Sequence, residues 1–178
     1  MASKKLRKML GSAESPYIVS LMRLIETQSK ATIAKWCLDY AEANILPIFE
    51  TRRPGDDRPR RALMASRDWF EGKVKLKEVK NIILNECHSA ARELDADPAA
   101  QAAARACGQA AACFHTPTHS LGLAFYGAAA LAYDRLGLDE SAEVYDAFAA
   151  VECAKMEAAL RAIAVENEAN PAKIDWHC

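Results

Sequence analysis

The stretch that decides the fold covers residues 97–136, with the sequence DPAAQAAARACGQAAACFHTPTHSLGLAFYGAAALAYDRL. Alanine dominates it, and the 28 residues between Arg105 and Asp134 contain no Asp, Glu, Lys or Arg. Alanine is the best helix former, and small side chains let helix axes approach closely. We therefore predict a central helical element, either one helix kinked at Pro117 or a hairpin of two helices.

Capping signals and apolar periodicity predict further helices on both sides of this stretch. Ser15 followed by Pro16 marks one helix start, and Asp97 followed by Pro98 marks another. Helical spacing of apolar residues indicates helices over residues 16–25, 30–49 and 76–94, and no run shows the alternation of strands. Pro47 is expected to kink or end the second of these helices.

Two more helices are expected from their caps. Asp56 or Asp57 caps a helix that stops at Gly72, and Asp139 caps a last long helix that reaches residue 163. The predicted fold class is all-α: a single-domain bundle or array of about six to eight helices around the Ala-rich hairpin.

Length and composition predict one globular domain. The 178 residues are 51% hydrophobic and 26% charged, which is enough to build a single core. We assign residues 1–14 to a basic N-terminal segment, residues 15–170 to a single all-helical domain, and residues 171–178 to an extended C-terminal tail. The basic segment is expected to be a short or frayed helix, and Trp176 is expected to hold the tail against the domain.

Charge does not point to a nucleic-acid or membrane partner, because the net charge is only −1. It is unevenly placed, since residues 1–61 carry 12 basic and 7 acidic side chains, and residues 62–178 carry 11 and 17. Two oppositely charged parts either attract each other within one fold or steer a charged partner. The charge-free run is interpreted as a buried helix pair and not as a membrane span, because alanine contributes little to insertion.

Cysteine usage indicates a reducing compartment. None of the six cysteines forms a CxxC motif, and the basic start MASKKLRKML is not followed by an apolar signal segment. A cytoplasmic protein with free thiols is therefore expected.

His115 and His119 are four residues apart, the spacing at which two imidazoles on one helix face bind a metal. His88 lies on another predicted helix and completes a possible set of ligands. Pro117 separates the pair, which favours a structural role in which one or both imidazoles donate to a carbonyl freed by the proline. The metal site at His115, His119 and His88 is kept as an alternative, with acid–base chemistry as a third reading, and no cofactor is predicted.

The segment of residues 52–61 concentrates five arginines and two aspartates. Guanidinium groups bind carboxylate or phosphate through two parallel hydrogen bonds. No Gly-rich phosphate cradle accompanies the arginines, so an Arg–Asp network that fixes the loop is the favoured interpretation. A site for a phosphate-bearing ligand is the alternative.

Common enzyme signatures are missing from the chain. It contains no GxSxG or GxGxxG motif and no carboxylate pair that sequence spacing brings together. The sequence therefore predicts a protein that is not an enzyme. Trp36, Trp69 and Trp176 are interpreted as core or docking residues and not as a ligand cage.

Four stretches, in this order and spacing, resemble a known family over roughly residues 30–135. They are Trp36…Tyr40-Ala41-Glu42…Leu46-Pro47…Phe49-Glu50; Asp57-Arg58-Pro59-Arg60…Ala62-Leu63; Trp69…Gly72; and Ala103…Gly108…His115…His119…Gly122…Tyr126. The family is a small bacterial one, the immunity proteins of polymorphic toxin systems. The resemblance implies an all-helical cytoplasmic protein that binds a cognate toxin domain and neutralises it.

The same resemblance implies a set of binding residues. Carried over by position, they are Asp57, Arg58, Arg60, His115 and His119, which form a shared polar pocket or hold the fold. A functional pocket is expected where the break at residues 115–119 meets the loop at residues 57–60.

Overall fold

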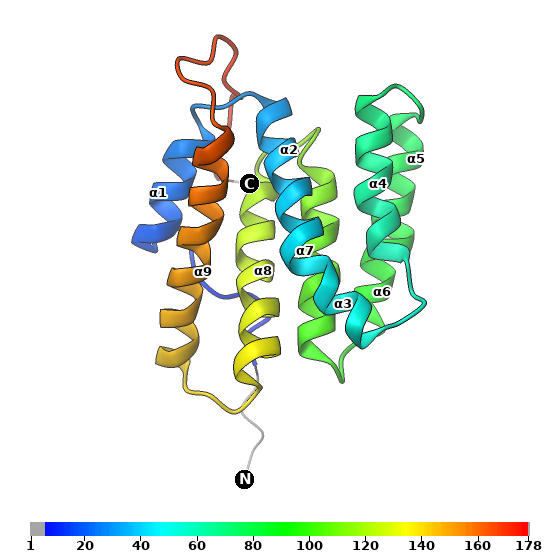
Figure 1. The fold of residues 1–178 in the computed structure, drawn as a ribbon, viewed down its shortest axis with the longest axis vertical. Coiled ribbons are helices and arrows are strands. Elements are labelled where there is room, and N and C mark those ends of the chain that lie inside the picture. Colours follow the sequence, from blue (N-terminus) through cyan, green and yellow to red (C-terminus); the bar gives the residue numbers. More distant parts are fainter. Residues whose placement is uncertain (1–5, 178) are drawn as a thin grey trace.

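Seven continuous helices build the fold in the computed structural model, which describes residues 6–177 (Figure 1). Five are regular α-helices: α1 (Pro16–Ile25), α4 (Arg58–Phe70), α7 (Pro98–Ala112), α8 (His119–Leu136) and α9 (Ala142–Ile163). The described residues contain no strand. The predicted all-α class and the number of helices are confirmed.

The other two helices each contain a π-helical segment. One is α2 (Lys30–Tyr40), η1 (Ala41–Ile45) and α3 (Leu46–Arg52), and the other is α5 (Leu76–Asn81), η2 (Ile82–Cys87) and α6 (His88–Arg92). Pro47 lies in the first turn of α3, directly after the π segment. Pro47 therefore does not end the helix, which continues beyond the predicted residue 49 to Arg52, because the change in hydrogen bonding accommodates a residue without an N–H group.

The Ala-rich stretch forms a hairpin of two helices at the centre of the molecule (Figure 1). Asp97 caps α7 through its carboxylate, which accepts from the Ala100 N–H at 3.2 Å, and Pro98 occupies the first turn. Residues 113–118 form the connection to α8. Most of α7 is buried, because α2, α3, α4 and α6 pack around the hairpin.

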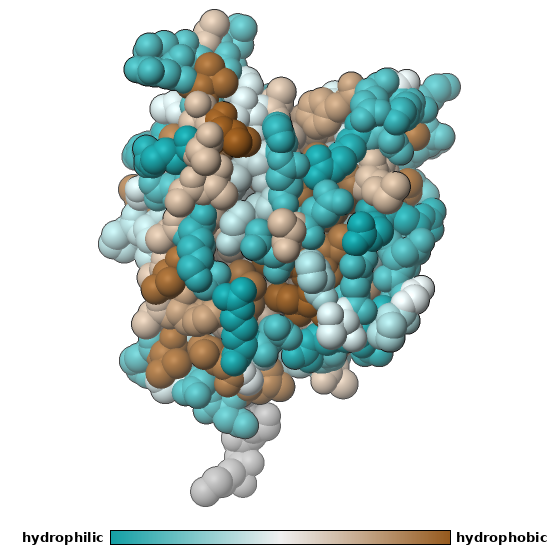
Figure 2. Space-filling view, viewed as in Figure 1, coloured by the Kyte–Doolittle hydropathy of each residue, from teal (hydrophilic) through white to brown (hydrophobic). Residues whose placement is uncertain are grey.

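The core joins helices that are far apart in the sequence. The Trp36 side chain is 2% exposed, and its Nε1 donates across the core to the Met156 carbonyl of α9 at 3.0 Å. Figure 2 shows hydrophilic side chains over most of one face, with apolar side chains in small groups. Within the described residues, no helix combines the length and apolar character that crossing a membrane requires.

Both ends of the described chain lie against the helices. The prediction of a short helix at the N-terminus is wrong for residues 6–14, which form no helix. Leu10 is instead buried, and its N–H donates to the Phe125 carbonyl at 3.2 Å. Residues 1–5 of the predicted basic segment lie outside the described residues. Trp176 holds the tail as predicted, because its Nε1 donates to Glu26 at 2.6 Å.

Two smaller predictions have different outcomes. The last helix is capped by Ser141 and not by Asp139, since the Ser141 hydroxyl accepts from the Val144 N–H at 3.3 Å. The five cysteines in the described part of the chain are all free and buried, as predicted, and Cys178 lies outside it.

Candidate functional site

The two central histidines do not share a helix face. His115 lies in the connection between α7 and α8, and His119 is the first residue of α8. Their ring centroids are 6.2 Å apart. The Ser120 hydroxyl donates to the Pro117 carbonyl at 2.6 Å, so a side chain of α8 closes the turn that the proline creates.

His119 is held by a side chain of the opposite helix. Its Nδ1 lies 2.8 Å from Oε1 of Gln109, so a neutral imidazole with the proton on Nδ1 donates to this amide oxygen. Burial lowers the pKa of His119, which favours that neutral form. The predicted partner, a backbone carbonyl freed by Pro117, is therefore replaced by the Gln109 side chain.

The structure also shows the surroundings of His115 and tests the alternative of a metal site. The Nδ1 atom of His115 is buried without a hydrogen-bond partner, and burial lowers the pKa of this residue. In the described part of the chain, no group of three or more His, Cys, Asp or Glu side chains is arranged to hold a metal ion. The set His115, His119 and His88 is therefore not assembled as metal ligands.

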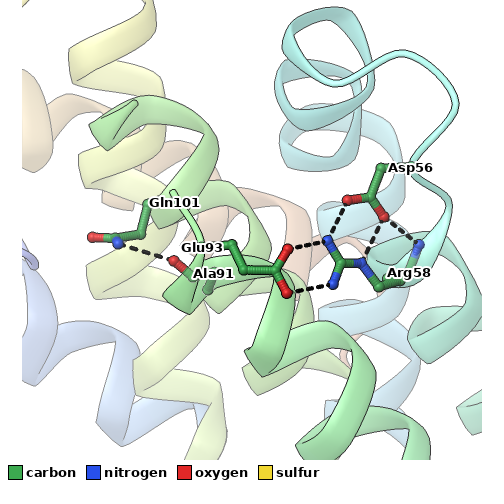
Figure 3. A network of polar contacts seen from close by, with 5 residues as sticks. All are labelled: Asp56, Arg58, Ala91, Glu93 and Gln101. Carbon is green, nitrogen blue, oxygen red and sulfur yellow. Dashed lines mark hydrogen bonds and ion pairs between the residues drawn. The ribbon is translucent and has the colours of Figure 1, made fainter. Parts of the chain in front are cut away.

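Arg58 forms a polar network between the start of α4 and the end of α6 (Figure 3). Its guanidinium donates to both carboxylate oxygens of Glu93, at 3.0 and 2.9 Å, and to both of Asp56, at 2.9 and 2.7 Å. Two residues before Glu93, the Ala91 carbonyl accepts from Gln101 of α7 at 2.9 Å. The end of α6 is thus fixed to α4 on one side and to α7 on the other.

The other arginines of this segment are mostly bound to carboxylates within the fold. Arg60 pairs with Glu50 at 2.6 Å, and Arg61 pairs with Glu86 at 2.6 Å. Asp57 is the N-cap residue of α4, but its side chain makes no capping hydrogen bond. These contacts match the predicted network that fixes the loop, and they occupy four of the five guanidinium groups that the phosphate alternative would use.

Part of the charge asymmetry along the sequence is compensated by ion pairs within the fold. Among the described residues, five ion pairs join a basic residue of the first 61 positions to an acidic residue of the remainder. They are Arg7–Asp146, Arg52–Asp97, Arg52–Asp134, Arg58–Glu93 and Arg61–Glu86.

The predicted junction between the histidine turn and the arginine loop is not present. Phe114, next to His115, stacks on Trp69 near the end of α4, with ring centroids 4.6 Å apart. Arg58 lies eleven positions earlier, at the start of α4, so the two clusters are separated by about 16 Å along this helix. The structure brings His115 close to His119, and it keeps both away from Asp57, Arg58 and Arg60.

A pocket of about 250 Å³ opens instead between α6 and the central hairpin. Its polar lining consists of His88 and Arg92 from α6, Arg105 and Gln109 from α7, and Tyr126 from α8. The Arg105 guanidinium carbon lies 5.7 Å from the centre of the Tyr126 ring, within the range of a cation–π contact. This pocket is the candidate functional site.

Two glycines make room for the lining of this pocket. A Cβ at Gly108 would stand 2.6 Å from Cε1 of His88, and a Cβ at Gly122 would stand 2.3 Å from Oε1 of Gln109. Real Cβ contacts are not this short, so an alanine at either position would displace the neighbouring side chain. The glycines of the Ala-rich stretch therefore shape the site.

The charged residues that line the pocket are positive. The pKa of His88 is lowered by burial and by the charges of Arg92, His119 and Arg105. Arg58 and His119 lie outside the pocket, but each holds a part of its lining in place. Arg58 fixes the end of α6 beside Arg92, and His119 fixes Gln109.

Sequence reasoning singled out only part of this lining. His88 appeared in the metal alternative and Tyr126 in the family resemblance, whereas Arg92, Arg105 and Gln109 were missed. One signal was present, because Arg105 and Gln109 are four residues apart on a helix in which nine of the fifteen residues are alanine.

Comparison with known proteins places the chain in a family. The family described as Imm-5 like putative immunity protein matches residues 23–159, which is well over half of the chain. The matched range contains every lining residue of the pocket. No curated protein and no solved structure matches the chain. The protein therefore belongs to the Imm-5 like putative immunity protein family, in agreement with the resemblance carried by its sequence.

Proposed function

We propose that this protein binds the toxin domain of a bacterial polymorphic toxin system and neutralises it in the cytoplasm. It acts as a stoichiometric inhibitor and not as an enzyme. The observation that carries the proposal is the family match over residues 23–159, which reaches from the end of α1 into α9. A protein domain is the kind of partner that an immunity protein requires.

The fold suits a binding protein whose surface is formed before the partner arrives. Its helices share one buried core, and surface networks such as Arg58 with Asp56 and Glu93 hold neighbouring helix ends together. A rigid surface loses little conformational entropy on association, which leaves more of the contact energy for affinity. Charged side chains left outside these networks would contribute to specificity and to the rate of capture.

Co-expression with a toxin domain found among the genes next to this one tests the proposal. We expect growth to be restored, and we expect the purified pair to migrate as a complex of fixed stoichiometry. Titration of toxin activity should end at one equivalent of this protein, because an inhibitor that occupies its target is not regenerated. A toxin domain from an unrelated system serves as the control.

Two results would reject the proposal. Absence of both a complex and growth rescue would show that the protein does not bind and neutralise that toxin domain, as the proposal requires. Full protection at a small fraction of one equivalent would indicate turnover, which contradicts a stoichiometric inhibitor.

A further inference from the structure

Most arginines of this protein pair with carboxylates, but within the described residues no carboxylate pairs with the two in the pocket. Nine of the twelve arginines form an ion pair within the described residues. The three for which no ion pair is found in that part of the chain are Arg53, Arg92 and Arg105, and the last two line the same pocket. None of the described residues that line this pocket is acidic. Two permanent positive charges therefore share the pocket without a carboxylate.

The Arg105 side chain and the Arg92 backbone are positioned before any ligand arrives. The Arg105 head group is held over the Tyr126 ring at 5.7 Å. The backbone of Arg92 is fixed on both sides, since its neighbour Ala91 accepts from Gln101 and its neighbour Glu93 is paired with Arg58 (Figure 3). Because little side-chain freedom is left to lose at Arg105 and little backbone freedom at Arg92, the entropic cost of binding an anion is low.

Size and hydrogen-bonding groups restrict the ligand. The volume of about 250 Å³ is smaller than typical pockets for drug-sized molecules, which begin near roughly 300 Å³. Gln109 uses its carbonyl oxygen to accept from His119, so its amide nitrogen remains as a donor. Guanidinium and amide donors together match the acceptor oxygens of one small anionic group.

We propose that this pocket binds a single oxyanion group, a carboxylate or a phosphate, through the guanidinium groups of Arg92 and Arg105. Gln109 supplies a neutral donor to the same group. The group belongs either to a free small molecule or to a side chain of a bound partner. The inference does not depend on the proposed immunity function, because it rests on the pocket alone.

Calorimetric titration with inorganic phosphate and with succinate tests the site, at constant ionic strength set by chloride. We expect saturable binding of at least one of these anions at one site per chain. The variants Arg92→Gln and Arg105→Gln should each weaken it by about tenfold or more, because each removes a charged donor. Arg53→Gln is the matched control, since Arg53 is also without an ion pair in the described part of the chain but lies outside the pocket. Circular dichroism confirms that each variant is folded.

A second readout comes from the His88 imidazole. A bound anion offsets the positive charges that lower the pKa of His88, so the pKa should rise when phosphate is added. This change is measured by an NMR pH titration, and it should disappear in Arg105→Gln. No saturable binding of either anion, or equal weakening by Arg53→Gln, would overturn the proposal.

Competition separates the two sources of the anionic group once binding is established. If phosphate displaces the toxin domain, and Arg105→Gln weakens that complex, a side chain of the partner occupies the pocket. If the complex forms unchanged in Arg105→Gln while phosphate binding is lost, the ligand is a free anion. If no toxin complex forms with any variant, the immunity proposal fails and the anion site still stands on the titration.

Discussion

Gly108 lies against the imidazole of His88, so closely that a Cβ at position 108 would stand 2.6 Å from Cε1. Glycine inside a helix costs about 1 kcal/mol relative to alanine. The centre of α7 therefore contains a poor helix former at the point where His88 of α6 needs space. This relationship links the pocket to the stability of the hairpin.

Gly108→Ala should lower the free energy of unfolding while His88 is present. The new Cβ forces the imidazole out of its place, and overpacking of this kind costs about 1–3 kcal/mol. After the gain of about 1 kcal/mol in helix propensity is subtracted, the expected net loss is up to about 2 kcal/mol. Urea unfolding measures the change.

In a His88→Ala background, the same substitution should raise the free energy of unfolding. The steric conflict is then absent, so only the gain in helix propensity of up to about 1 kcal/mol remains. A double-mutant cycle with these variants should give a coupling energy of at least about 1 kcal/mol. Equal effects of Gly108→Ala in both backgrounds would show that the two residues do not constrain each other.

Arg58→Ala should destabilise the fold by roughly 1 kcal/mol, because it removes the network that joins α4 to α6. Arg58→Lys should restore only part of this, since an ammonium group cannot make two parallel bonds to each carboxylate. The pKa of Asp56, now lowered by its hydrogen bonds to Arg58, should rise toward the ordinary value, which NMR can follow.

Arg23→Ala is the matched control for this substitution. Arg23 pairs with Glu26, three residues away on the surface, and 72% of its side chain is exposed. Its loss should change stability by only a few tenths of a kcal/mol. Similar effects at both positions would mean that the bridge between helices adds nothing beyond an ordinary surface pair.

Local signals in the sequence predicted the helices well. Asp97 and Pro98 start α7 as expected, and the Ala-rich stretch forms the central hairpin. The π segments were not predicted, because an extra residue within a helix depends on packing against other helices. Asp139 was predicted as the cap of the last helix, and the local sequence could not exclude Ser141, because both residue types suit that position.

The arrangement of the site could not be predicted for a geometric reason. Arg58, the first residue of α4, pairs with Glu93, which lies shortly before α7 in the chain. Trp69, near the end of α4, contacts Phe114 just after the end of α7, so α4 and α7 run in the same direction. That direction places the arginine loop and the histidine turn at opposite ends of the pair. Sequence spacing within single helices contains no information on this orientation. Arg92 of α6 and Arg105 of α7 line the same pocket from two different helices, so spacing within a single helix could not predict their proximity either.

Trp36→Phe should destabilise the fold by about 1–3 kcal/mol, because it removes the hydrogen bond that Nε1 donates to the Met156 carbonyl at 3.0 Å and leaves a buried side chain too small for its site. Trp176→Phe is the comparison, since its Nε1 also donates to an oxygen, that of Glu26, but in a partly exposed tail. The second substitution should cost less than the first, because water can replace the lost donor. Chemical denaturation of both variants tests the order, and a larger loss at Trp176 would contradict it.

Mild acid should destabilise this protein before its carboxylates titrate. Burial lowers the pKa values of His88, His115 and His119 below the ordinary histidine value of about 6.5. The unfolded chain therefore takes up protons at a higher pH than the folded chain does. The stability contributed by the neutral imidazoles is complete above about pH 6.5, and it is lost as the pH falls toward the folded pKa values.

The melting temperature should consequently decrease between about pH 7.5 and about pH 5, a window that lies above the ordinary carboxyl pKa values of about 4. Asp39, Asp56 and Glu93 have lowered pKa values and add their own loss only at more acidic pH. His119→Gln should flatten the decrease, because it removes one of the three imidazoles whose protonation opposes folding. His177→Gln, in the exposed tail, is the control for removing an imidazole. A melting temperature that rises on acidification through this window would mean that the folded protein stabilises charged histidines, which is the opposite of what their burial requires.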